Sequence, residues 1–255
     1  MRGTGRGGYT LVEILVVLAV TGIVLATLAV PLQNLVQNRK VEETQRLLEQ
    51  AREALLTFAS AYGYLPCPAD NTSGVEVATA NHVTGDCGLW YGFLPAATIG
   101  FTPVDAQGFA VDAWGADSGR IRYAVSADTV GGIAMPFTRS NGMAAAGAAS
   151  IGSTTNLFHI CGSGSGVTPG VNCNTAQTLA TNAVVVVWSV GRNGGAGGGA
   201  SVHEAENPHP AGGSADRIFV SRAQSDAAGV EFDDVVTWIP ATTLVSRLMA
   251  SGRLP

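Results

Sequence analysis

The 255-residue chain contains a single lysine, Lys40, and charged residues make up only 13% of it. One lysine excludes a lysine-dependent phosphate loop or a Schiff-base mechanism elsewhere in the chain. The 14 basic residues are spread along a sequence whose formal net charge is −5. Such a distribution offers no basic patch for nucleic acid, so we expect no nucleic-acid partner.

The sequence also lacks the common catalytic motifs. It has no Gly-x-Ser-x-Gly elbow, no dinucleotide-binding fingerprint and no Cys-x-x-Cys pair. The stretch from His203 to His209 combines two histidines with two glutamates, but its spacing is wrong for a His-Glu-x-x-His site. Pro208 and Pro210 also forbid the helix that such a site requires. We expect a solvated loop there and predict that the chain is not an enzyme.

A long uncharged run dominates the N-terminal region. Residues 1–8 form a polar leader with two arginines, and the 19 residues from Ile14 to Leu32 carry no charge. A bilayer-spanning helix needs about 20 such residues, whereas the apolar core of a secretory signal peptide has about 7–15. The leading arginines place the N-terminus in the cytoplasm. A plain membrane anchor is the alternative, but it leaves unexplained Glu13 at the edge of the run, because a charge costs about 2.5–3.5 kcal/mol near the bilayer centre.

The helical pattern continues beyond this run. Apolar residues recur at three- and four-residue spacing on one face, and Gly63 and Pro66 end the pattern. We therefore predict one helix from about Thr10 to Tyr62, with its first half in lipid and with bends at Gly22 and Pro31. The predicted apolar stripe consists of Leu47, Leu48, Ala51, Ala54, Leu55, Phe58 and Tyr62.

From Gly63 onward, short apolar runs alternate with residues typical of turns. This texture predicts strands, with 184–188 as a central strand that is covered on both faces. The fold class is therefore α+β, with a long N-terminal helix packed on an antiparallel sheet. Small residues predict loops at 131–153, 162–170 and 191–213, and a short final helix is expected at 241–252. The candidate strands are 120–127, 156–160, 183–190, 217–221 and 234–239.

Four cysteines, Cys67, Cys87, Cys161 and Cys173, lie in the segment expected outside the cytoplasm. An even number in an oxidising compartment favours disulfides, and three connectivities are possible. Proximity in sequence favours Cys67–Cys87 and Cys161–Cys173. A zinc site is the weaker alternative, because no histidine stands at ligand spacing.

The segment from Gly8 to Glu13, followed by the apolar run, resembles the N-terminal signature of type IV pilins and pseudopilins. The resemblance implies that a prepilin peptidase cleaves between Gly8 and Tyr9 and methylates the new amino group of Tyr9. Tyr9 stands where phenylalanine is usual. The implied organisation is a leader at 1–8, a helix at 9–62 that is transmembrane in its first half, and an extracytoplasmic head at 63–255.

The same resemblance gives Glu13 a role in assembly. It implies that the Glu13 carboxylate pairs with the amino terminus of an adjacent subunit and sets the register of a helical filament. Breaking one side of a buried pair costs about 3–5 kcal/mol. The alternative is a solvated glutamate among lipid headgroups. The implied partners are the prepilin peptidase, other pilin or pseudopilin subunits and an inner-membrane assembly platform, with the head in the periplasm.

Segments of the head resemble type II secretion pseudopilins more specifically. These segments are 65–69, 112–115, 122–125 and 232–238, and Ala113 stands where the major pseudopilin has proline in Asp-Pro-Trp-Gly. The resemblance implies a pseudopilin or minor pilin rather than an adhesive major pilin. Taken alone, Asp112 and Trp114 indicate a turn and a core aromatic. Two other classes stay open: a membrane-tethered binding module that recognises a ligand through its head, and a tethered periplasmic enzyme.

The resemblance also implies a calcium site. Major pseudopilins bind calcium in a C-terminal loop, and hard oxygen ligands suit that ion. Residues 189–194 and 233–235 resemble the segments that bound that loop, although Arg192 replaces an acidic residue. The alternative is that Asp233 and Asp234 simply begin or cap the last strand. The candidate ligands are Glu204, Glu206, Asp216, Asp233 and Asp234.

Overall fold

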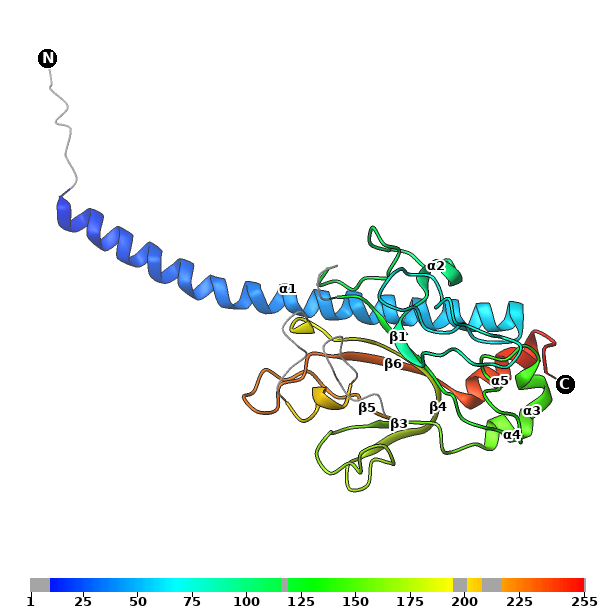
Figure 1. Cartoon of the computed structure of the whole chain (residues 1–255). Helices are drawn as coiled ribbons and strands as arrows, with labels where there is room; N and C mark the ends of the chain where they lie inside the picture. Colours follow the sequence, from blue (N-terminus) through cyan, green and yellow to red (C-terminus); the bar gives the residue numbers. More distant parts are fainter. Residues whose placement is uncertain (1–9, 116–118, 195–200, 208–216, 255) are drawn as a thin grey trace, which may run out of the picture. The chain divides into compact units, whose positions relative to one another are not determined.

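The computed structural model describes residues 10–115, 119–194, 201–207 and 217–254, with only the backbone described for 25–34. It has an N-terminal helix and a curled sheet, so the predicted α+β class is confirmed (Figure 1). The chain divides into two compact units, Met1–Glu42 and Glu43–Pro255.

Helix α1 (Leu11–Tyr62) begins one residue after the predicted start and ends where predicted. The helix continues without interruption through Gly22 and Pro31, so neither residue ends it, and the bends expected there stay predictions. At its start, the Thr10 hydroxyl accepts a hydrogen bond from the Glu13 backbone N–H at 3.2 Å, which is N-cap chemistry. In the part of the chain that the structure describes, no helix combines the length and the apolar character needed to cross a membrane.

In the second unit, residues 43–62 of α1 bury an apolar face. Its most buried members are Leu47, Leu48, Ala51, Leu55, Leu56 and Ala59. The predicted stripe is therefore correct at its N-terminal end, but the outer positions differ: Tyr62 is exposed and Phe58 half-buried. The centroids of these two rings instead lie 4.4 Å apart, and the Phe58 ring also packs edge-on against Tyr64 at 5.9 Å between centroids. The aromatic cluster gives them a partner other than the core.

Six strands form one sheet. Its order is β1-β2-β4-β3-β5, and β6 also pairs with β4. The β3–β5 pair is parallel and the other pairs are antiparallel, so the sheet is mixed and the prediction of an antiparallel sheet is wrong at that pair. The bounds are β1 (Tyr91–Phe93), β2 (Arg122–Val125), β3 (Phe158–Cys161), β4 (Thr178–Ser189), β5 (Ile218–Val220) and β6 (Val235–Pro240).

Strand β4 lies at the centre of the sheet, as its apolar run predicts. Each residue from Val184 to Trp188 exposes 1% of its surface or less. The indole of Trp188 packs edge-on against Phe219 of β5 at 5.1 Å, and Val186 belongs to the same cluster. A strand covered on both faces needs no polar alternation, and this is why the continuous run identifies it.

Short helices complete the head. The predicted loop at 131–153 contains two of them, so that expectation is wrong in part: alanine favours helix and overrides the flanking glycines. Helix α5 confirms the predicted C-terminal helix, and α3, α4 and α5 gather at one end of the head near the C-terminus (Figure 1). The bounds are α2 (Ala96–Ile99), α3 (Gly142–Ala146), α4 (Ala148–Ser153), the 3-10 helix η2 (Glu204–Glu206) and α5 (Ala241–Ala250).

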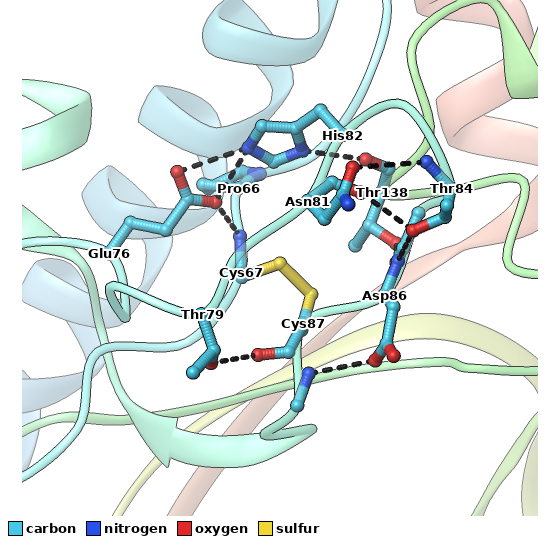
Figure 2. Close-up of a disulfide and its surroundings, with 12 residues drawn as sticks. Pro66, Cys67, Glu76, Thr79, Asn81, His82, Thr84, Asp86, Cys87 and Thr138 are labelled. Atoms are coloured by element: carbon cyan, nitrogen blue, oxygen red, sulfur yellow. Dashed lines mark hydrogen bonds and ion pairs between the residues drawn. A yellow bond between two sulfur atoms is a disulfide. The ribbon is translucent and has the colours of Figure 1, made fainter.

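Both favoured disulfides are present, Cys67–Cys87 and Cys161–Cys173, with Cα–Cα distances of 5.4 and 5.5 Å. Figure 2 shows the first of them beside a histidine network. His82 Nε2 lies 3.1 Å from the Glu76 carboxylate, and Nδ1 lies 2.7 Å from the carbonyl oxygen of Thr138. Only a doubly protonated imidazole can donate to both acceptors. The hydrogen bond to Glu76 accordingly raises the pKa of His82.

Candidate cation site

Three carboxylates meet where β6 begins. Asp233 and Asp234 directly precede β6, and Glu204 is the first residue of η2. Each side chain offers one oxygen, and these oxygens all lie within 4.8 Å of one another. Each of the three residues exposes less than a tenth of its surface. Three acids buried this closely repel one another unless they are protonated or share a cation.

Local backbone geometry brings Asp233 and Glu204 together. Gly191, the second residue after β4, has φ +64°. It lies so close to Asp233 that a Cβ added to it would stand 2.4 Å from both the backbone oxygen and the Oδ1 of Asp233. The Asn193 side chain donates to Glu204 Oε2 at 3.1 Å, and the other Glu204 oxygen accepts from the Asp233 backbone N–H at 2.9 Å. Segments 191–193, 204 and 233 are thereby fastened to one another.

Asn207 positions the third carboxylate. Its amide nitrogen donates to Asp234 Oδ2 at 2.6 Å and to the Val220 carbonyl at 3.1 Å. Its amide oxygen accepts from the Val220 N–H at 2.8 Å. The Asn207 side chain thus satisfies both backbone groups of a β5 residue, as a neighbouring strand would, and joins the sheet to the acidic cluster.

The electrostatics of the cluster favour a bound cation. Burial, and next the charge of Glu204, raise the pKa of Asp233 to about 6. Burial also raises the pKa of Asp234. Arg192 approaches Asp233 Oδ2 only to 3.8 Å, because its guanidinium donates to Asp226 at 2.7 Å. Among the described residues, no arginine or lysine forms a hydrogen bond with the three carboxylates.

Two buried oxygens at the cluster remain free to act as acceptors within the described part of the chain. Asp233 Oδ1 and Asn193 Oδ1 are buried and have no hydrogen-bond partner among the described residues. A buried acceptor without a partner costs about 1–3 kcal/mol. Three carboxylates form an all-oxygen donor set of the kind that Ca²⁺ prefers. Glu204, Asp233 and Asp234 therefore fit a calcium ion, and the buried Asn193 Oδ1 is a further unpartnered acceptor on the side chain that contacts Glu204.

The sequence prediction and the structure overlap in part. Of the candidate ligands, Glu204, Asp233 and Asp234 come together, whereas Glu206, at the other end of η2, is not in the cluster. Asp216 lies outside the described residues. Asn193, whose side chain contacts Glu204, was not among the candidates, because an asparagine in a glycine-rich loop looks like an ordinary turn residue. The alternative also describes a real feature, since Asp233 and Asp234 do precede β6.

His203 has a structural position rather than a ligand position. Its Nδ1 accepts a hydrogen bond from the Gly164 backbone N–H at 3.0 Å, while the Ser163 hydroxyl stands at 3.5 Å. An acceptor that is already occupied is poorly placed to take a proton from serine. This contact links the 201–207 segment to the hairpin that the Cys161–Cys173 disulfide closes.

The predicted assembly residues belong to the first unit. Gly8 and Tyr9 lie outside the described residues, and Glu13 lies exposed in the first turn of α1.

Comparison with known proteins bears on this N-terminal region. Residues 4–29 match the family model described as the prokaryotic N-terminal methylation motif, which is the signature of type IV pilins and pseudopilins. No curated protein and no solved structure matches the chain. The chain thus carries the pilin-type signature over its N-terminal segment. The signature supports a pilin-like or pseudopilin family, whose members are structural subunits.

Proposed function

We propose that the chain is a structural subunit, a pseudopilin or minor pilin, of a filament like those of type II secretion systems and type IV pili. The observation that carries the proposal is the methylation motif at residues 4–29. Prepilin peptidase would cleave between Gly8 and Tyr9 and methylate Tyr9, and an inner-membrane platform would then add the subunit to the filament.

The exposed apolar surface of α1 supports this role. Leu11, Leu15, Leu18 and Ile23 each expose more than 60% of their surface. A soluble monomer rarely leaves so much contiguous apolar surface in water. Lipid would cover it before assembly, and the helices of neighbouring subunits would cover it afterwards. A head-to-tail contact whose rotation does not close builds a fibre rather than a ring, and this is the contact proposed between subunits.

Charge pairing would set the register within the fibre. The Glu13 carboxylate would neutralise the methylated amino terminus of an adjacent subunit, which leaves one satisfied pair in place of two isolated charges. The head would lie in the periplasm, where its two disulfides persist.

A calcium ion at Glu204, Asp233 and Asp234 would stabilise the head. The ion would supply positive charge to three buried carboxylates and would join the segment at Glu204 to the segment at Asp233 and Asp234. The chain's own residues do the positioning: Asn207 holds Asp234, and Asn193 holds Glu204. The expected benefit to a filament subunit is a rigid surface at the start of β6.

Mass spectrometry of the protein from its own membranes tests the processing step. We expect a chain that begins at Tyr9 and carries one extra methyl group. Glu13→Ala should then reduce incorporation into sedimentable filaments while the head stays folded, and the exposed residue Glu42 provides the matched control, Glu42→Ala. Normal incorporation of the Glu13 variant would contradict the register role, and a chain that still begins at Met1 beside an active peptidase would contradict the processing.

A further inference from the structure

A groove of about 630 Å³ lies within the second unit, between α1 and the start of β6. Gln45, Glu49 and Arg52 of α1 form one wall, and residues 221–224 contribute the other. Its volume falls within the range of about 300–1,000 Å³ that is typical of ligand sites. The filament role proposed above does not use this groove.

One side of the groove is the outer edge of a strand. β6 pairs with β4, and no strand of the described residues pairs with its other edge. Arg52 Nε donates to the Trp238 carbonyl at 3.0 Å, so this carbonyl faces away from β4. Successive residues of a strand direct their backbone groups to opposite edges. The backbone N–H groups of Val236 and Trp238 and the Val236 carbonyl therefore face the groove.

The side chains of the groove set its charge. Arg222 lines it half-buried, and no acceptor among the described residues forms a hydrogen bond or ion pair with its guanidinium. Glu49 is already engaged by Arg52 at 3.1 Å and by the Thr237 hydroxyl at 2.7 Å. Asp234 also lines the groove, but its carboxylate accepts from Asn207. Among the described residues, the guanidinium of Arg222 is thus a groove-lining cation with no carboxylate in direct contact.

We propose that an extended segment of a partner protein binds in this groove by adding a strand to the outer edge of β6, with an acidic side chain against Arg222. Open strand edges bind extended peptides through the backbone, and side-chain contacts then give specificity. Native proteins usually cover or block such an edge. Here α1 approaches the edge with polar side chains, and this leaves space beside the strand.

Two synthetic peptides test the proposal on the full chain in detergent micelles. Both have the sequence Thr-Val-Thr-X-Val-Thr-Val, with X either Glu or Lys, and binding is measured by calorimetry. We expect the Glu peptide to bind about three- to fivefold more tightly, the range of an exposed ion pair. Arg222→Glu should reverse the preference. Arg139→Glu, outside the groove, should preserve it.

The backbone part of the proposal has its own measurement. Amide hydrogen exchange should slow at Val236 and Trp238 when the Glu peptide binds, and Val236→Pro should abolish binding of both peptides while β4 stays protected. Equal binding of the two peptides to both Arg222 forms would overturn the proposal. Absence of new protection at Val236 and Trp238 would also overturn it. Protection that rises with chain concentration in the absence of peptide would overturn it in favour of self-association.

Discussion

Calcium should stabilise the head through the carboxylate cluster, and Asp234→Asn should remove that effect selectively. Asparagine keeps the size of Asp234 and an oxygen that can accept from Asn207. Burial raises the pKa of Asp234, so in the ion-free protein the neutral amide replaces a carboxyl group that already resists ionisation. We therefore expect the variant to fold with nearly unchanged stability in the absence of calcium.

The size of the calcium effect follows from linkage. A ligand at a hundred times its Kd stabilises the folded state by about 2.7 kcal/mol. For a domain of this size each kcal/mol raises Tm by about 2–4 °C, so the total shift is about 5–10 °C. Thermal unfolding of the full chain in detergent, with and without excess chelator, measures it.

A carboxylate in the same segment provides the control. Glu231 is half-buried, stands two residues before Asp233 and is not in the cluster. Glu231→Gln should retain the whole calcium-dependent shift, whereas Asp234→Asn should lose it. An equal shift in both variants, or no shift in the unaltered chain, would refute the cation site.

Three further outcomes are expected. Glu76→Gln should destabilise the head by about 1.5–3 kcal/mol, the value of a hydrogen bond to a charged group. Because Glu76 raises the pKa of His82, this loss of stability should be fully present below pH 6.5 and should disappear as pH rises through the folded-state pKa. Urea unfolding from pH 5 to 9 measures it, and a pH-independent difference would contradict the network. Burial lowers the pKa of His159, whose ring nitrogens have no partner among the described residues, so stability should fall as pH drops below 6.5, and His159→Leu should flatten that part of the same profile. Replacing Cys161 and Cys173 together by serine should cost about 2–4 kcal/mol, measured by the urea midpoint, and reducing agent should then have a smaller effect on the variant than on the parent chain.

The elements that are buried in the core could be predicted from the sequence, because burial imposes a regular pattern of apolar residues on them. The apolar run at 184–188 identified the central strand, and the spacing of Leu47, Leu48 and Ala51 identified the buried face of α1. Both signals are local, because a strand or helix in the core needs apolar residues at a fixed period. The short strand β1, Tyr-Gly-Phe, has no such period and was missed.

Long-range geometry could not be predicted in the same way. The parallel pairing of β3 with β5 depends on the path that the chain takes between the two strands. These strands are only four and three residues long, and their own sequences carry no signal of that path. The site shows the same limit. Asp233 and Asp234 became candidates because residues 233–235 resemble a segment that bounds the calcium loop of major pseudopilins, but Asn193 becomes a candidate only when Gly191 brings its loop against Asp233.

At the N-terminus, the structure distinguishes capping of the helix, which uses Thr10, from the exposed carboxylate of Glu13. Thr10 and Glu13 have the spacing of a capping box, in which both side chains would satisfy backbone groups of the first turn. The Thr10 hydroxyl does accept from the Glu13 N–H, whereas the Glu13 carboxylate is exposed and forms no hydrogen bond to the described residues.

This separation determines how the Glu13→Ala experiment is interpreted. The Thr10 cap survives the substitution, since it uses only the backbone N–H of residue 13. The helix would lose only the favourable interaction of an acid with its N-terminal dipole, about 0.3–1 kcal/mol, and alanine's helix propensity offsets part of it. A large loss of filament incorporation could therefore not arise from unfolding of α1. If mass spectrometry shows that the variant still begins at Tyr9, the loss comes from the missing carboxylate in the assembled fibre.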